Sequence, residues 1–201
     1  MEFRLFLYII IILSAVFHEF FHGWMANYLG DPTAKEAGRL SLNPLRHIDL
    51  MGTVIIPLFL MFTTGSFIGW AKPVPYNPYN LRDKKWGSTK VAFAGPGANF
   101  LLAVIFALCL RFLSPYDLFF VPLSWIVYIN ITLALFNLIP IPPLDGSKLI
   151  MDLFPNRFQK FYQIALFGPF LAILIAVIIL PPIAKIIYFI FTGEAFIPYV
   201  F

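Results

Sequence analysis

The stretch AVFHEFFHGW, residues 15–24, places three ionisable side chains, His18, Glu19 and His22, inside an apolar run. The surrounding run, from about residue 3 to about residue 27, otherwise has the length and composition of a helix that crosses a bilayer. An ionisable side chain inside a membrane helix costs at least about 2.5–3.5 kcal/mol of insertion free energy, and such residues mark functional sites by default. The stretch therefore predicts a membrane protein whose first helix carries a functional site.

The composition of the whole chain also indicates a polytopic membrane protein. Of its 201 residues, 60% are hydrophobic and 12% are charged, and the mean hydropathy is +0.84. Average soluble chains carry about 25% charged residues. A single cysteine excludes a disulfide framework and a cysteine-based metal site. We expect one domain over residues 1–201, embedded in a lipid bilayer and without a nucleic-acid partner.

Hydropathy divides the chain into four full spans and one doubtful segment. The full spans are expected at about 3–27, 91–113, 118–139 and 161–180. The first is interpreted as a retained signal anchor, because no cleavage site follows its apolar run. Residues 50–70 contain Pro57, Gly65 and Gly69, which is typical of a broken, re-entrant hairpin, although a full crossing stays open.

Two further features complete the predicted fold. Pro181 and Pro182 break the last apolar run, so a short C-terminal helix is expected after the fourth span. The polar connection at 30–49 and the Pro-rich stretch at 69–80 suggest short strands that pair as a small sheet at the membrane boundary. The predicted class is an all-α polytopic membrane protein with about four full spans, a re-entrant segment and this small β-sheet.

The spacing in HEFFH matches a metal site on a helix. Positions i and i+4 share one helix face, so His18 and His22 present two imidazoles to the same point. Zn²⁺ accepts imidazole nitrogen in a tetrahedral shell. Glu19 is adjacent but angled away, which suits a carboxylate that takes a proton from an activated water.

A catalytic zinc site needs a third protein ligand, and the sequence offers several candidates. They are the last histidine and the acidic residues in or near apolar segments, namely His47, Asp49, Asp117, Asp145 and Asp152. Asp145 is favoured because three nearby prolines unwind the chain at the end of an apolar segment. Unwound backbone at membrane depth is tolerated only where it is buried in protein or lines a water-filled cavity. His47 is expected to support the site rather than to bind metal.

Three motifs in order resemble the site-2 protease family of intramembrane zinc metalloproteases. They are HEFFH at 18–22, AGPGANF at 94–100 and NLIPIPPLDG at 137–146. The resemblance covers nearly the whole chain and is closest to the compact branch of the family, which lacks PDZ and CBS domains. It implies a single zinc ion held by His18, His22 and Asp145.

The resemblance also implies roles for the neighbouring residues. Glu19 would be the catalytic base, and Asn137 would contact the substrate backbone or the oxyanion. Asn99 belongs to a Gly-Pro-x-x-Asn motif, for which a supporting role at the site and simple helix packing remain equal alternatives. The implied activity is regulated intramembrane proteolysis of a transmembrane protein substrate. A divalent-metal transporter or an inactive relative with the same ligands is the alternative.

The distribution of basic residues predicts an orientation in the cell membrane. If residues 50–70 are re-entrant, one face of the membrane holds eleven of the 14 Lys and Arg residues, and only Arg4, Arg111 and Lys185 lie on the other. The positive-inside rule makes the richer face cytoplasmic. The N-terminus is then outside, and the zinc site lies toward the cytoplasm.

Overall fold

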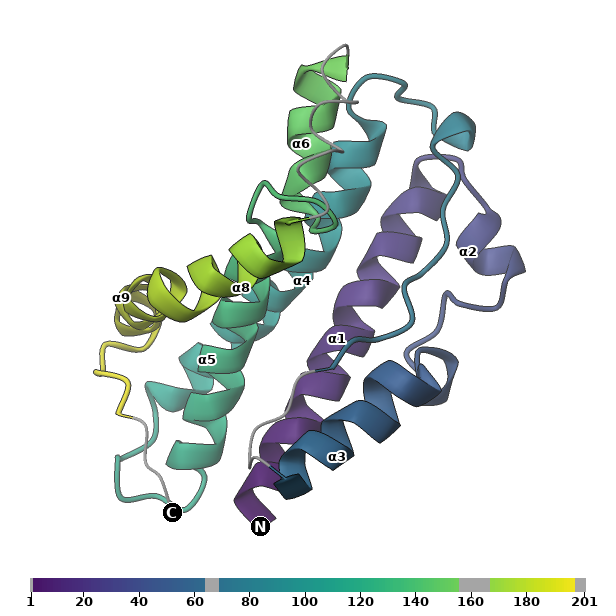
Figure 1. Ribbon diagram of the computed structural model, residues 1–201. Coiled ribbons are helices and arrows are strands. Elements are labelled where there is room, and N and C mark those ends of the chain that lie inside the picture. Colours follow the sequence, from purple (N-terminus) through teal and green to yellow (C-terminus); the bar gives the residue numbers. More distant parts are fainter. Residues whose placement is uncertain (1, 64–68, 156–166, 198–201) are drawn as a thin grey trace.

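The structure, a computed structural model, describes residues 2–63, 69–155 and 167–197, and all regular elements in these ranges are helical (Figure 1). The helices are α1 (Glu2–Tyr28), α2 (Thr33–Glu36), η1 (Pro44–Arg46), η2 (Leu50–Ile55), α3 (Ile56–Thr63), η3 (Pro78–Asn80), α4 (Gly87–Leu110), α5 (Phe120–Asn137), α6 (Gly146–Leu153), α8 (Gly168–Ile178) and α9 (Leu180–Thr192). By length and hydropathy, α1, α4 and α5 could each cross a membrane. The pair α8 and α9, bent by 51°, would make a fourth span if it is one broken helix.

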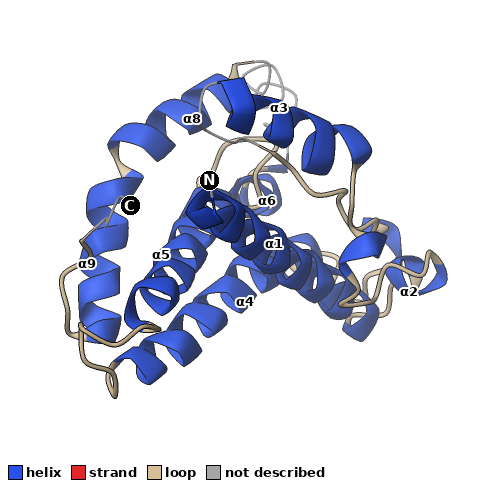
Figure 2. Ribbon diagram, turned by 90° about the horizontal axis from the view of Figure 1, so that it is seen from below, coloured by secondary structure: helices blue, strands red, loops and turns tan. Residues whose placement is uncertain are grey.

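The three long helices form the centre of the molecule. Helix α4 packs against both α1 and α5. Helices α1 and α5 run in the same direction, and α4 runs opposite to them (Figure 1). Helix α9 flanks α5 on one side, and α2 lies beside α1 on the other (Figure 2). The C-terminal ends of α1 and α5 therefore lie at the same end of the bundle.

Small side chains allow the helices of the core to approach closely. Ala103 and Ala107 of α4 meet Val127 and Ile131 of α5, and all four are buried. Tyr188 of α9 closes this cluster. Small residues at helix contacts are typical of membrane bundles, where packing rather than the hydrophobic effect holds the helices together.

The outer face of α1 is apolar, as expected of a helix that faces lipid. Leu5, Ile9 and Leu13 recur every four residues and are 46%, 47% and 51% exposed. Four-residue spacing places these side chains on one stripe of the helix. Exposed leucine and isoleucine in such a stripe match hydrocarbon as their surroundings.

Two Asn-Pro pairs begin the short 3₁₀ turns of the connections. Asn43 accepts a hydrogen bond from the backbone of Leu45 at 3.0 Å, and Pro44 is the first residue of η1. The same arrangement recurs where Asn77 precedes Pro78 at the start of η3. Asparagine is a preferred cap, and proline fits the first helical position because its missing N–H would have no partner there.

The predicted β-sheet at the membrane boundary is wrong, because the described ranges contain no β-strand. Residues 69–77 run alongside α1 without regular structure (Figure 1). Pro73 and Pro75 have no N–H to donate to a strand ladder. The N–H groups of Trp70 and Lys72 bond to separate acceptors, the carbonyls of Gly52 and His47, each at 3.0 Å. The polar connection before this segment folds into α2 and η1 instead of strands.

The doubtful segment at 50–70 begins with η2 and α3 and returns to its starting point. The N–H of Trp70 donates to the carbonyl of Gly52 at 3.0 Å, so the two ends of the segment lie together. Residues 64–68 are outside the described ranges, as are residues 161–166 at the start of the fourth predicted span. The re-entrant insertion of 50–70 stays a prediction, as do the membrane boundaries of the spans.

Candidate metal centre

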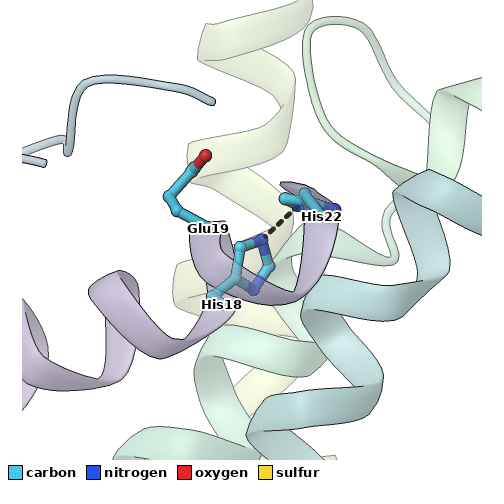
Figure 3. Close-up of side chains that lie close together, drawn as sticks. All are labelled: His18, Glu19 and His22. Carbon is cyan, nitrogen blue, oxygen red and sulfur yellow. Dashed lines mark hydrogen bonds between the residues drawn. The ribbon is translucent and has the colours of Figure 1, made fainter. Parts of the chain in front are cut away.

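Three donor atoms converge between the C-terminal half of α1 and the segment that follows α5. His18 and His22 are one turn apart on α1, and their Nε2 atoms lie 2.9 Å from each other (Figure 3). Asp145, immediately before α6, brings its Oδ2 within 3.1 Å of His18 Nε2 and 3.2 Å of His22 Nε2. The side chains of the three residues are 9%, 11% and 21% exposed. The chain thus brings together all three residues predicted as metal ligands.

The donor set fits a zinc ion. At zinc–ligand distances of about 2.0–2.1 Å, tetrahedral geometry separates two donors by about 3.3 Å. The three separations of 2.9, 3.1 and 3.2 Å are close to this value. Two imidazole nitrogens and one carboxylate oxygen are also a set of three protein ligands, which leaves a fourth position for water.

The outward nitrogens of both imidazoles are held by acceptors. His22 Nδ1 lies 2.7 Å from the carbonyl oxygen of Val91, and His18 Nδ1 lies 2.6 Å from Asn99 Oδ1. A carbonyl oxygen can only accept, so each Nδ1 carries a proton, and in the neutral imidazole each Nε2 has the free lone pair that a metal ion needs. Such outer partners orient metal-binding histidines and raise their basicity.

A buried polar network fixes the orientation of Asn99. Its amide nitrogen donates to Asn130 Oδ1 at 2.9 Å and to the carbonyl of Ser14 at 3.2 Å. Asn130 in turn donates to Ser14 Oγ at 3.0 Å. Because the Asn99 NH₂ group has these acceptors, its oxygen faces His18. Asn99 therefore contacts a residue of the donor set, and helix packing alone does not describe its position.

Gly95 gives α4 its close approach to the donor atoms. A Cβ at this position would lie 2.5 Å from His22 Nε2 and 2.6 Å from His18 Nε2. Real Cβ atoms essentially never approach that closely, and the obstructing atoms belong to buried side chains. The glycine of the AGPGANF motif thus keeps clear the space beside the two nitrogens.

Glu19 lies beside the donor set but has a partner of its own. Its side chain extends away from the histidine pair in Figure 3. One carboxylate oxygen of Glu19 lies within 4.8 Å of ligand atoms on both histidines. Its Oε2 accepts a hydrogen bond from the backbone N–H of Val74 at 2.7 Å. This position suits a base that reaches a water at the site without replacing a ligand.

Two cavities meet at the centre. The first, of about 290 Å³, is lined mostly by apolar side chains but also by His18, Glu19, His47 and Asn137. The second, of about 230 Å³, is lined by all three residues of the donor set and again by Glu19 and Asn137. Asn137 thus lies where both cavities open onto the site, and its amide nitrogen donates to the carbonyl of Leu133 at 3.0 Å.

The rival ligand candidates have other partners in the structure. His47 is 1% exposed, and its Nε2 lies 2.7 Å from the carbonyl of Ser41. Each remaining carboxylate accepts from a backbone N–H near a helix or turn, in the pairs Asp49 with Gly52, Asp117 with Ser114, and Asp152 with Thr89. Asp145 is the carboxylate that the structure places against both histidines.

Sequence reasoning missed two contributors to the site. Asn130 is fully buried in an apolar helix, and an amide in the middle of a predicted span is a signal that could have identified it. Val74 contacts Glu19 through its backbone N–H, and no pattern of side chains in the sequence predicts a backbone contact. Its only sequence signal is its place between Pro73 and Pro75.

Asp31 is fully buried beyond the end of α1 and anchors the segment that contains Val74. Burial alone would raise its pKa, but hydrogen bonds from Thr33, Asn77 and Asn80 outweigh this effect, and the pKa of Asp31 lies below its usual value. The ionised carboxylate joins α2 to the segment that leads to Val74. The site is therefore supported from a distance by a charged residue whose hydrogen bonds offset its burial.

Comparison with known proteins identifies the family. The sequence profile of Peptidase family M50 matches residues 6–121 and 117–180. The chain belongs to this family, the site-2 protease family of intramembrane zinc proteases.

Several relatives carry the name of a zinc metalloprotease. YwhC of Bacillus subtilis is 37% identical over 162 residues, which cover 75% of this chain and 69% of the relative. Rip2 of Mycolicibacterium smegmatis is 32% identical over 138 residues, or 67% of this chain and 52% of the relative. Rip2 of Mycobacterium tuberculosis is 26% identical over 137 residues, with the same two coverages. The matched region thus spans about half the length of the mycobacterial relatives. No solved structure matches the chain.

Proposed function

We propose that this chain is an intramembrane zinc metalloendopeptidase that hydrolyses peptide bonds in or near transmembrane segments of other membrane proteins. The observation that carries the proposal is the convergence of His18 Nε2, His22 Nε2 and Asp145 Oδ2 within 3.2 Å of one another. Asp145 is 127 residues from His18 in the chain, so no local helix geometry accounts for this meeting. Membership of Peptidase family M50 supports the same chemistry.

The residues of the site divide the work of hydrolysis. His18, His22 and Asp145 would hold one zinc ion, which when bound supplies a Lewis acid that lowers the pKa of a water ligand to about 7. The Glu19 carboxylate takes a proton from the attacking water and passes it to the leaving amine. The Asn137 amide, at the meeting of the two cavities, contacts the substrate backbone or the developing oxyanion.

The cavities suit a substrate that has left its helical conformation. In a helix, each backbone carbonyl accepts a hydrogen bond from an N–H group of the same helix. A transmembrane substrate must therefore unwind locally before one of its carbonyl groups can be attacked. The cavity of about 290 Å³ combines apolar residues of α1, including Ile11 and Ala15, with His18 and Glu19. An unwound apolar segment would find apolar contacts and the catalytic groups in one space. Water would reach the site from the side on which the polar connections lie.

The proposed function places the chain in the cell membrane with a defined orientation. Residues 50–70 enter the membrane and return, consistent with the hydrogen bond between Trp70 and Gly52 at their two ends. Eleven of the 14 Lys and Arg residues then lie on the face that contains the polar connections. That face is cytoplasmic by the positive-inside rule, with the N-terminus outside and the zinc site near the cytoplasm.

The proposal is tested by comparing cells that carry the chain with cells that carry Glu19→Gln. Mass spectrometry of their membranes should show transmembrane protein fragments that form only with the unchanged chain. Glu19→Gln should keep one zinc per chain, because Glu19 is not a ligand, and should lose at least about a hundredfold in cleavage rate. Full zinc-dependent cleavage by Glu19→Gln would refute the assigned base. Zinc uptake into vesicles that contain the purified chain, without cleavage, would favour a transporter.

A further inference from the structure

A segment that crosses the site donates a hydrogen bond to the residue proposed as the base. This segment, residues 69–77 with the sequence GWAKPVPYN, is called the strap. Pro73 and Pro75 have no N–H, so Val74 is the sole backbone donor among residues 73–75. That donor bonds to Glu19 Oε2 at 2.7 Å. A bond from N–H to an ionised carboxylate is about twice as strong as a neutral one.

The strap is fixed to the rest of the chain on both sides of Val74. On one side, Trp70 and Lys72 donate to the carbonyls of Gly52 and His47, each at 3.0 Å. On the other side, Asn77 donates to Asp31 Oδ2 at 2.6 Å. These contacts tie the strap to η2, to the end of η1 and to the turn after α1.

Arg39 holds the strap from a third direction. Its Nη2 donates to the carbonyl of Lys72 at 2.6 Å and contacts the carbonyl of Pro73 at 3.3 Å, and its Nη1 donates to the carbonyl of Arg46. Proline also restricts the residue that precedes it, so Lys72 and Val74 have little conformational freedom. The Val74 N–H is therefore presented on a rigid backbone.

The side chain of Val74 fits a recess on α1 that Gly23 provides. Val74 is 7% exposed, and a Cβ on Gly23 would lie 3.0 Å from its Cγ1 atom. Gly23 is four residues after Glu19, so both lie on the same face of α1. The strap therefore packs closely against α1 one turn from Glu19, and its backbone contacts on both sides of Val74 hold the N–H at the carboxylate.

We propose that the backbone N–H of Val74 positions the Glu19 carboxylate for proton transfer. This inference rests on the proposed function, in which Glu19 is the base. By occupying Oε2, the N–H leaves the other carboxylate oxygen to take the proton of the attacking water. It also holds the carboxylate away from the histidine nitrogens, so that Glu19 stays outside the ligand set. Val74 is a positioning residue, and the strap is the element that carries it.

The kinetic test compares two substitutions at one position. Val74→Pro removes the N–H, whereas Val74→Ala keeps it and shortens only the side chain. The probe is a 24-residue leucine- and alanine-rich transmembrane peptide with a central Gly-Pro pair, a fluorophore and a quencher. Val74→Pro should lower kcat by about ten- to a hundredfold with KM and zinc content unchanged. Val74→Ala should lose no more than about threefold.

Two additions keep this comparison decisive. An ester in place of the amide nitrogen of residue 74 removes the same N–H without a ring, and it should reproduce the Val74→Pro loss even if the proline variant misfolds. Combined with Glu19→Gln, it should cause no further loss, because the two changes disable one unit. An ester variant with unchanged kcat, or losses that multiply, would overturn the proposal.

A measurement without cleavage separates this inference from the proposed function. Amide hydrogen exchange at Val74 should be slow in the zinc-loaded chain and at least about tenfold faster in Glu19→Ala, which has no acceptor. Equal exchange in the two proteins would show that the contact is absent and would end the proposal. If the peptide is never cleaved but the exchange difference is found, the contact stands and the assigned activity fails.

Discussion

Gly95 packs directly against the imidazole of His22: a Cβ added to this glycine would lie 2.5 Å from His22 Nε2. Gly95→Ala should therefore displace the histidine or α4, and we expect at least a tenfold loss of zinc affinity. Gly97 is the matched control, since it lies in the same helix and a Cβ there meets no atom within 4 Å. Gly97→Ala should retain zinc and be up to about 1 kcal/mol more stable, because alanine favours a helix. Zinc content and thermal unfolding of the two purified variants measure both effects.

Asn99 should contribute to zinc affinity through His18. Asn99→Ala removes the acceptor 2.6 Å from His18 Nδ1, and loss of such outer partners typically lowers metal affinity by ten- to a hundredfold. Thr132→Ala is a suitable control, because the Thr132 hydroxyl donates to the carbonyl of Tyr128 one turn earlier in the same helix. Competition with a fluorescent chelator measures the two affinities. Equal affinities would mean that Asn99 does not support the site.

Asp145 and Asp152 should respond differently to the same substitution. Asp145→Asn replaces a charged donor that lies within 3.2 Å of both histidines, and we expect most of the zinc to be lost. Asp152→Asn weakens the bonds from the N–H and hydroxyl of Thr89, at 2.9 and 2.7 Å, and should lower stability while zinc is retained. Equal zinc loading of the two variants would argue against Asp145 as a ligand.

Acid should weaken the support that Asp31 gives to the strap. The folded pKa of Asp31 lies below its unfolded value of about 3.9, so its stabilising contribution is complete above that pH. The contribution is lost as the pH falls through the folded pKa. Asp31→Asn should lower stability at pH 7 and reduce the loss of stability on acidification below about pH 4. Denaturant unfolding of the unchanged chain and of Asp31→Asn at several pH values provides the comparison.

Much of the site could be predicted because its signals are local or chemically rare. The spacing of His18 and His22 follows from helix periodicity, and prolines beside Asp145 indicate unwound backbone. The sheet was wrong because alternating residues and prolines at 69–80 resemble an edge strand, while strand formation depends on a partner that the pattern does not reveal.

The contacts that hold the site could not be predicted for a related reason. Val74 and Glu19 are in contact although they are 55 residues apart in the sequence. The contact uses a backbone N–H, which every residue except proline possesses. The clearance at Gly95 likewise depends on the packing of α4 against α1, which three-dimensional geometry decides. Local periodicity identifies which residues share a face but not which faces meet.

Zinc K-edge X-ray absorption on the purified chain tests the central claim most directly. The account predicts one zinc per chain with two imidazole nitrogens at about 2.0–2.1 Å and carboxylate or water oxygen at about 2.0–2.2 Å. In His22→Ala, the imidazole signal of any retained zinc should fall to that of one histidine. A chain that binds zinc with an unchanged spectrum after His22→Ala or Asp145→Ala would contradict the account.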